Sequence, residues 1–355
     1  DPTGAPCPVG HYCPPGTAYD SQFPCVAGTY QPYEKATNET ACMLCSPGTY
    51  CEGEGNEYPT DNCTMGWFCT GGSSRNKPFM MGNYTSIDVC ACAGFNYTGG
   101  KCQPGSFCPT GASAPQECTG GMYCEDYELA VPNGLCSAGY YCPGGQDRRD
   151  PPEFFCLAGH YCPEGSALPV ACPNGTYSNT TGNTELANCM ACTPGMFCNG
   201  EALVEPTGPC DPGYYCPEGQ TTPTPPDYVC PRGFECPQGS ATPTLCGRGY
   251  YAPNFQQSTC DICPAGKYCD PNELANATGI IDPVDCPPGF YCPARTEFAY
   301  QNPCQPGTYS NATQLTAQAD CFDCTGGYYC ETPGLITPTA PCTAGFYCDS
   351  RANQS

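Results

Sequence analysis

The sequence predicts a small disulfide-rich β fold, in which tandem cysteine-rich modules form an elongated rod with little secondary structure and no single hydrophobic core. Three observations predict this class. The chain has 38 cysteines in 355 residues, and such a fraction is typical of disulfide frameworks. The motif C-x-x-G-x-x-C occurs fourteen times, from Cys7–Cys13 to Cys342–Cys348. Leu, Ile, Val and Phe make up only about 11% of the chain, too little for an ordinary packed core.

Each C-x-x-G-x-x-C motif predicts one tight turn followed by a short strand. The glycine supplies a turn of positive φ, and an aromatic residue fills the last variable place in every copy except Cys230–Cys236. Strand alternation makes that aromatic face away from the second cysteine, where it can lie over the disulfide of the next unit. A proline often follows and favours an extended exit. Because Gly, Pro or Cys interrupts almost every window of ten residues, long helices are excluded.

A longer repeat, which we call the long module, is defined by cysteine spacing. Intervals of 17, 3, 6, 12 and 6 residues occur in three segments, 25–69, 172–216 and 304–348. The segment 246–292 is a variant with intervals of 14, 3, 6, 17 and 6. Agreement of five intervals in three segments indicates internal duplication.

A second period of 74 residues repeats Cys142, Cys156, Cys162 and Cys172 as Cys216, Cys230, Cys236 and Cys246. Residues 70–101 break the spacing and are predicted to be an insertion or junction. The predicted organisation is therefore a first cysteine-rich unit (1–69, with the long module 25–69), the insertion 70–101, short repeats (102–171), a long module (172–216), short repeats (217–245), the variant long module (246–292) and a last unit (293–355, with the long module 304–348).

The preferred disulfide scheme closes every C-x5-C doublet on itself. It uses 28 cysteines, and it pairs the remaining long-module cysteines across the wider interval. It leaves Cys90 and Cys92, whose mutual bridge would be strained, so we expect a different pairing somewhere between Cys63 and Cys108. The preferred pairs are Cys7–Cys13, Cys25–Cys42, Cys45–Cys51, Cys172–Cys189, Cys192–Cys198, Cys246–Cys260, Cys263–Cys269, Cys304–Cys321, Cys324–Cys330 and Cys342–Cys348.

The cysteine content predicts an oxidising compartment, and we expect an extracellular or cell-surface protein of the secretory pathway. No stretch approaches 18 apolar residues, so no direct membrane insertion is expected. The chain has neither an initiating Met nor a signal peptide, which favours a mature or excerpted piece of a longer precursor. Nine N-x-Ser/Thr sequons agree with secretion, and they begin at Asn38, Asn62, Asn83, Asn96, Asn174, Asn179, Asn276, Asn311 and Asn353. Thr-Pro tracts at 221–226 and 337–341 suit O-glycosylation or a stiff linker.

The net charge of −23 disfavours nucleic acid as a partner, since phosphate binding needs clustered Lys and Arg. Neighbouring carboxylates such as Glu52 and Glu54, or Asp282 and Asp285, could bind Ca²⁺ weakly, but no EF-hand loop is present and no calcium site is assigned. The only expected additions are N-linked and O-linked glycans.

No enzyme is predicted. Four C-x-x-C motifs, at 42–45, 189–192, 260–263 and 321–324, could elsewhere hold zinc or act as redox dithiols. Zinc needs reduced thiolates, and a redox dithiol needs a helix N-terminus, which this sequence does not form. The only histidines, His11 and His160, occupy the same place before a Tyr and assemble no catalytic set.

The segments beginning Cys25-Val-Ala-Gly-Thr-Tyr, Cys172-Pro-Asn-Gly-Thr-Tyr and Cys304-Gln-Pro-Gly-Thr-Tyr, each followed by C-x-x-C, resemble the ephrin-receptor-like cysteine-rich repeat. They are also similar to the first submodule of tumour necrosis factor receptor repeats. The resemblance implies small β modules laid end to end. Such modules occur in receptor ectodomains and in large surface proteins of protists and algae. The excess of C-x5-C doublets looks more like surface-coat and flagellar-hair (mastigoneme) proteins.

Two functions remain open. The favoured one is an extracellular structural glycoprotein, a self-associating subunit of a surface filament, coat or appendage, whose partners are copies of itself or other surface glycoproteins. The alternative is the ectodomain or stalk of a cell-surface receptor or adhesion protein. One apolar patch would serve either role as a contact, and it comprises Trp67, Phe68, Phe79, Met80 and Met81.

Overall fold

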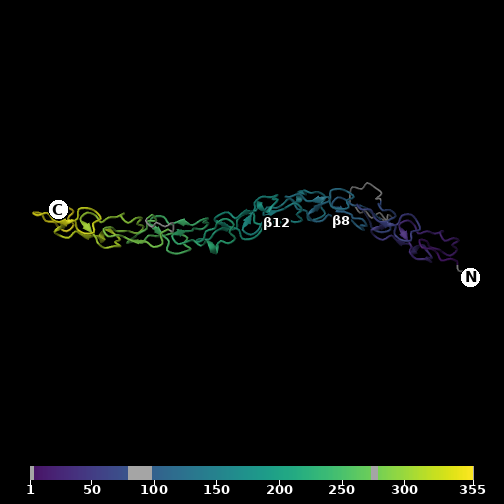
Figure 1. Cartoon of the computed structure of the whole chain (residues 1–355), viewed down its shortest axis with the longest axis horizontal. Helices are drawn as coiled ribbons and strands as arrows, with labels where there is room; N and C mark the ends of the chain where they lie inside the picture. Colours follow the sequence, from purple (N-terminus) through teal and green to yellow (C-terminus); the bar gives the residue numbers. More distant parts are fainter. Residues whose placement is uncertain (1–3, 79–97, 273–278, 355) are drawn as a thin grey trace. The chain divides into compact units, whose positions relative to one another are not determined.

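The computed structural model describes residues 4–78, 98–272 and 279–354. In these ranges it has no α-helix, and its regular structure consists of strands of two or three residues and short 3-10 helices. The predicted class, tandem disulfide-rich β modules, is confirmed. Figure 1 shows the chain as a succession of small turns and hairpins.

The described strands form two-stranded antiparallel sheets, each made by strands that are neighbours along the chain. Up to residue 171 the pairs are β1 (Thr29–Tyr30) with β2 (Met43–Leu44), β3 (Thr49–Tyr50) with β4 (Asp61–Asn62), β5 (Trp67–Cys69) with β6 (Gly99–Lys101), β7 (Ser106–Phe107) with β8 (Gln116–Glu117), β9 (Met122–Tyr123) with β10 (Gly134–Leu135), and β11 (His160–Tyr161) with β12 (Val170–Ala171).

The later pairs follow the same order. They are β13 (Thr176–Tyr177) with β14 (Met190–Ala191), β15 (Met196–Phe197) with β16 (Gly208–Pro209), β17 (Phe234–Glu235) with β18 (Thr244–Leu245), β19 (Tyr250–Tyr251) with β20 (Asp261–Ile262), β21 (Lys267–Tyr268) with β22 (Val284–Asp285), β23 (Thr308–Tyr309) with β24 (Phe322–Asp323), and β25 (Tyr328–Tyr329) with β26 (Ala340–Pro341).

The 3-10 helices mark the two kinds of internal repeat. Three of them lie just before the second cysteine of the wide bridge in a long module: η1 (Glu39–Ala41), η3 (Leu186–Asn188) and η5 (Gln318–Asp320). The other two, η2 (Pro152–Phe154) and η4 (Pro226–Tyr228), lie 74 positions apart, each just before a doublet. The structure therefore repeats with the same period of 74 residues as the cysteines.

The repeating element is a turn unit, which runs from an opening cysteine through the glycine three positions later to the aromatic strand. The glycine has positive φ in every copy, as predicted; in Gly195 it is +84°. The strand after the glycine pairs with the two residues before the next opening cysteine. In the first sheet, for example, Thr29 faces Leu44 and Tyr30 faces Met43.

Cystine sulfur takes the place of a conventional core. Nearly all described cysteines are buried, and the other buried apolar side chains apart from proline are Ala112, Ala252, Ile280, Ala299 and Leu315. At three places an aromatic side chain packs against a small cluster that contains the next disulfide. Phe68 packs against the cluster of Cys102, Cys108 and Ala112, Tyr251 against that of Cys263, Cys269 and Ile280, and Tyr291 against that of Cys304, Leu315 and Cys321.

Eighteen disulfides lie in the described parts of the chain. Every doublet closes on itself, and the long modules contain Cys25–Cys42, Cys172–Cys189, Cys246–Cys260 and Cys304–Cys321. The expectation of a different pairing between Cys63 and Cys108 is wrong for the described cysteines, because Cys63–Cys69 and Cys102–Cys108 are ordinary doublets. Strands β5 and β6 pair on either side of residues 70–98. Cys90 and Cys92 lie outside the described residues.

The described chain divides into two compact parts. The first contains residues 1–172 and 178–189, and the second contains residues 173–177 and 190–355. The division falls within the predicted long module 172–216. Each part contains doublets and long modules, so each carries the same kinds of junction.

Candidate functional surface: the junctions and what they leave exposed

Backbone hydrogen bonds join each turn unit to the next. In the second part, the Cys210 amide donates to the Gly195 carbonyl (3.0 Å), and the Gly195 amide donates to the Cys216 carbonyl (2.8 Å). The Cys198 amide donates to Gln220, and the Gly219 amide returns to the Cys192 carbonyl, both at 2.8 Å. These four bonds give partners to backbone amides and carbonyls that the short two-stranded sheets would otherwise leave unpaired.

The turn glycine also lies against the unit after the next one. A Cβ added to Gly195 would overlap the carbonyl oxygen of Gly239, and one added to Gly105 would lie 2.6 Å from that of Gly145. The motif therefore needs glycine twice, for positive φ and for close approach of another backbone. The sequence predicted only the first of these reasons.

The long modules have no cysteine at the seventh position, where a doublet would close. That position is occupied by Gln31, Ser178, Ala252 and Ser310, and all four residues are buried. Their backbones make the same bonds as a doublet cysteine: the Gly10 amide donates to Gln31 (2.7 Å), and the Gly159 amide donates to Ser178 (2.8 Å). The polar side chains can be buried here because they also have hydrogen-bond partners: Gln31 donates to the Ala41 carbonyl, and the Ser178 hydroxyl accepts from the Asn183 amide.

A second recurring position is the loop slot, the residue nine or ten positions after an opening cysteine. It is usually a glycine, but all seven described non-glycine residues with positive φ also occupy it: Lys35, Glu128, Ala202, Gln256, Arg295, Gln314 and Arg351. Sequence analysis missed this position, because only the backbone conformation distinguishes these residues from other loop residues.

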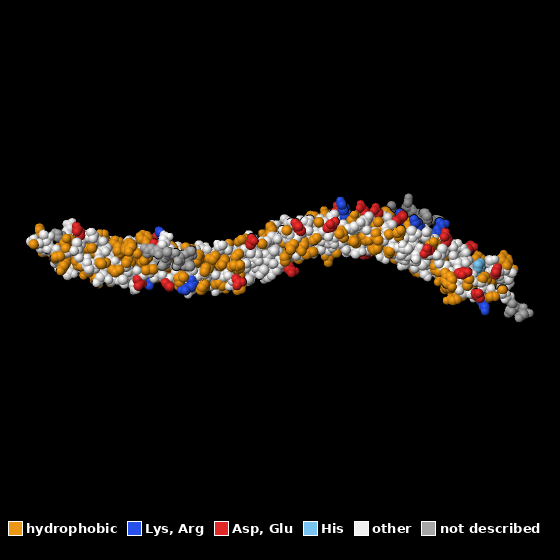
Figure 2. Space-filling view, viewed as in Figure 1, with side chains coloured by type: hydrophobic (Ala, Val, Ile, Leu, Met, Phe, Trp, Pro, Cys, Tyr) orange, Lys and Arg blue, Asp and Glu red, His pale blue; other side chains and the backbone are white. Residues whose placement is uncertain are grey.

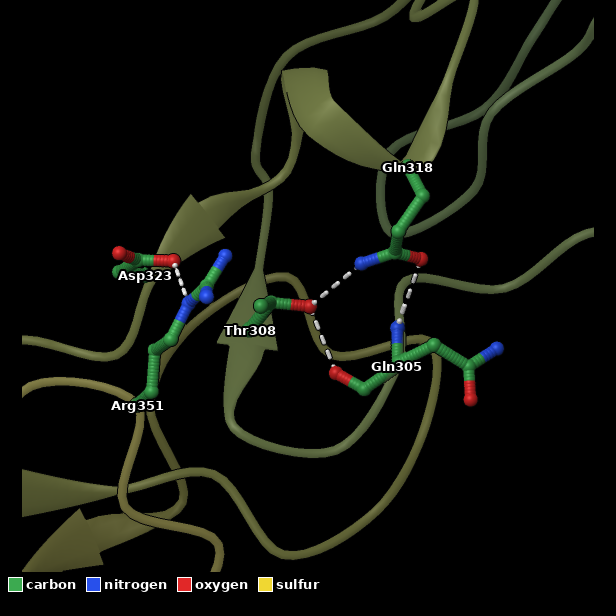
Figure 3. Close-up of polar contacts among 5 residues, drawn as sticks. All are labelled: Gln305, Thr308, Gln318, Asp323 and Arg351. Atoms are coloured by element: carbon green, nitrogen blue, oxygen red, sulfur yellow. Dashed lines mark hydrogen bonds and ion pairs between the residues drawn. The ribbon is translucent and has the colours of Figure 1, made fainter.

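Polar side chains in the loop slot reach residues of preceding turn units. Arg351 is paired with Asp323 at 2.6 Å (Figure 3). Gln256 donates to the Tyr214 hydroxyl at 3.0 Å, and the Arg295 guanidinium lies 5.2 Å from the centre of the Tyr250 ring. The loop slot therefore adds a side-chain contact to junctions that the backbone already forms.

Six of the nine sequon asparagines are described, and all six are exposed: Asn38, Asn62, Asn174, Asn179, Asn311 and Asn353. The Asn38 carboxamide accepts from the Thr40 amide at 3.1 Å, and that of Asn174 accepts from the Gly200 amide at 3.0 Å. Asn83, Asn96 and Asn276 lie outside the described residues. Glycosylation at all nine positions stays a prediction.

The predicted contact patch is only partly described. Trp67 and Phe68 are half-buried on β5, and Phe68 packs against the cluster of Cys102, Cys108 and Ala112. Phe79, Met80 and Met81 lie outside the described residues. The contact role of the patch stays a prediction.

The histidines and the C-x-x-C cysteines all take part in local structure. Nδ1 of His11 lies 3.1 Å from the Val9 carbonyl, and Nδ1 of His160 lies at the same distance from that of Ala158. The cysteines of the four C-x-x-C motifs are all in disulfides, and no two within one motif are bonded to each other. Each motif therefore joins the end of a long-module bridge to the start of a doublet.

Of the carboxylates considered for Ca²⁺, Asp285 has a direct cationic partner. Hydrogen bonds from Gln314 and Lys267 hold the pKa of Asp285 below its usual value, and Lys267 lies 2.9 Å away. Over the described ranges, no group of three or more His, Cys, Asp or Glu side chains is placed to hold a metal ion.

Large apolar side chains recur on the surface of both parts, between scattered acidic residues (Figure 2). Several lie twelve positions after an opening cysteine, and these are Tyr19, Leu168, Val204, Phe298 and Ile336. Others lie within the C-x-x-C motifs, as Met43, Leu44, Met190, Ile262 and Phe322 do. These side chains are the exposed apolar groups that recur with the repeat.

Comparison with known proteins adds one relative. The chain is 25% identical over 344 residues to cysteine repeat modular protein A of Toxoplasma gondii, an alignment that covers 89% of this chain and 9% of that protein. No protein-family profile matches the chain. The likeness supports a cysteine-rich repeat protein, and the narrower resemblance to ephrin-receptor-like repeats stays a prediction. No helix in the described ranges is long and apolar enough to cross a membrane.

Proposed function

We propose that this chain is an extracellular structural glycoprotein, a self-associating subunit of a cell-surface filament, coat or appendage. The observation that carries the proposal is the junction itself. The same kinds of backbone bond repeat from unit to unit, and each described turn unit has one disulfide, whereas the side chains between them vary. Such a chain maintains a scaffold and presents its outer side chains at regular intervals.

Large numbers of disulfides support the extracellular location, since they persist only under oxidising conditions. The recurring exposed apolar side chains support association with copies of the same chain, because a periodic surface is matched best by another of the same period. The partners would be copies of this chain or other surface glycoproteins. We propose no catalytic role and no cofactor beyond glycans.

The alternative is a receptor or adhesion stalk. It is favoured by the comparison, in which the chain covers a small share of a much longer cysteine-repeat protein. A stalk would use the same junctions but would leave ligand binding to another part of its parent protein.

Sedimentation velocity of the non-reduced protein tests the proposal. A net charge of −23 opposes self-association at low ionic strength, so we expect larger species to form as concentration and salt rise, followed by ordered assemblies under electron microscopy. The triple variant L168S/V204S/I336S should reduce association, whereas T242S, at the same twelfth position, should not. A wild-type protein that stays monomeric at every concentration and salt level would contradict self-association and favour the stalk.

A further inference from the structure

The disulfides of the structure differ in how accessible they are. Among interior turn units, the only half-exposed cysteines in the described ranges are Cys42, Cys189 and Cys260. Each is the second cysteine of the wide bridge in a long module. Cysteines of the interior doublets are at most 1% exposed. Cys13 and Cys342 are also half-exposed, but they belong to the first and last doublets of the described chain. Accessibility governs which sulfur a thiolate can reach.

Each of these accessible cysteines has an exposed apolar side chain one or two positions after it. Met43 and Leu44 follow Cys42, Met190 follows Cys189, and Ile262 lies two positions after Cys260. Leu44 and Ile262 are 70% and 58% exposed. An apolar side chain beside an accessible disulfide gives a thiol-bearing protein a surface on which to dock.

The stacking of the turn units does not depend on these bridges. The seventh position of each long module is already a buried non-cysteine residue whose backbone makes the junction bonds. In the first long module, the Gln31 side chain also donates to the Ala41 carbonyl at 2.7 Å, which ties the end of the loop to the turn. The loop would therefore stay in place after its bridge opened.

We propose that the long-module bridges Cys25–Cys42, Cys172–Cys189 and Cys246–Cys260 are exchangeable disulfides that react with an external thiol while the stack of turn units stays folded. The thiolate attacks the Sγ of the half-exposed Cys42, Cys189 or Cys260. A new S–S bond forms, the old one breaks, and the buried cysteine leaves as a thiolate that takes up a proton.

The outcome of the exchange depends on the attacking thiol. With a monothiol such as glutathione, the product is a mixed disulfide that the buried thiolate can reverse. With the dithiol of an oxidoreductase, the second thiol releases the cysteine, and the oxidoreductase leaves oxidised while the bridge is left reduced. The inference does not rest on the proposed structural role.

The last long module is an internal control with the same cysteine spacing. Cys321 is only 7% exposed. Gln318 lies across the turn, donating to the Thr308 hydroxyl and accepting from the Gln305 amide, both at 3.2 Å (Figure 3). Cys304–Cys321 should therefore exchange more slowly than Cys172–Cys189, which closes a loop of the same length.

The test is limited reduction of the native protein with dithiothreitol, followed by alkylation and peptide mass mapping. We expect the cysteines of the three exchangeable bridges to be labelled on the order of tenfold faster than those of interior doublets, and Cys304 and Cys321 to lag. Hydrogen exchange should show that the Cys45 amide, bonded to the Gly28 carbonyl at 2.9 Å, keeps its protection. The proposal would be overturned if interior doublets were labelled as fast as the three bridges, or if the Cys45 amide lost its protection when the Cys25–Cys42 bridge was reduced.

A second experiment distinguishes a small thiol from a thiol-bearing protein by comparing the rates at which each opens the bridges. Glutathione and a thioredoxin-type dithiol protein are each reacted with the native chain and with I262S. If the apolar side chain docks a protein, I262S slows opening of Cys246–Cys260 by the dithiol protein and leaves the glutathione rate unchanged. If both rates stay unchanged, the bridge is open to small thiols only. If the three bridges resist both thiols, the proposal is wrong.

Discussion

Doublets and long modules differ in where the disulfide closes, yet they stack in the same way. In the doublet Cys192–Cys198 the seventh residue is a buried cysteine, whereas in the turn unit that opens the same long module at Cys172 the seventh residue is Ser178. Both positions accept from a glycine amide of the preceding unit, at 3.2 Å and 2.8 Å. The comparison teaches that the backbone makes the stack, and that the disulfide mainly restrains the unfolded chain, at about 2–4 kcal/mol for each bridge.

The largest effect should come from breaking the part that doublets and long modules share, the turn glycine. Gly195→Ala adds the strain of positive φ, about 1–2 kcal/mol, and an overlap with the Gly239 carbonyl. We expect a total loss above about 3 kcal/mol in local stability, measured by hydrogen exchange of the Cys210 amide. Gly327→Ala is the matched control, since it has a φ of +87° and nothing within 4 Å of the added Cβ. Equal losses at the two glycines would contradict the importance of close approach.

A smaller loss of stability is expected at a buried position that two long modules fill with different residues. Asn183 and Leu315 both lie eleven residues after an opening cysteine, and both are buried. The Asn183 amide donates to the His160 carbonyl (2.8 Å) and to the Ser178 hydroxyl (2.9 Å). Asn183→Leu removes these bonds and those between Asn183 and Thr180, so we expect a loss of about 1–3 kcal/mol in local stability, measured by hydrogen exchange of the Cys162 amide. The reverse change, Leu315→Asn, should also destabilise its module; a neutral Asn183→Leu would show that the network is dispensable.

Acid should distinguish the same two modules at the start of their 3-10 helices. Backbone and side-chain hydrogen bonds from Thr316, and then the Ala317 amide, hold the pKa of Asp320 below its usual value. Its ionised form is therefore favoured in the folded state, and this stability is present above the ordinary carboxyl pKa and is lost as pH falls through the lowered one.

Asn188 occupies the equivalent place and accepts from the Thr184 and Glu185 amides without titrating. Thermal unfolding followed from pH 5 to strong acid should show less acid sensitivity in Asp320→Asn than in the native chain. Asn188→Asp should increase that sensitivity. An unchanged acid profile in both variants would rule out the Asp320 carboxylate as its source.

The smallest effect should come from the loop slot. Arg351 and Asp323 are both largely exposed at the surface, so the ion pair contributes at most about 1 kcal/mol. Arg351→Ala should shift the thermal midpoint only slightly at low salt and not at high salt. A large shift would mean that the loop slot, rather than the backbone, holds the junction.

By itself, the amino-acid sequence determined the class of fold, the turn glycines and the doublets, because cysteine spacing and glycine positions are local and repeat often. The same reasoning failed for the described cysteines between Cys63 and Cys108, where β5 pairs with β6 and both doublets are intact. Only the tertiary structure decided the close approach of another backbone at Gly195 and Gly105 and the burial of Ser178 at the seventh position. It also decided that Cys189 is half-exposed whereas the equivalent Cys321 is buried. These features depend on which residues of successive units meet, and no local pattern of residues records such contacts.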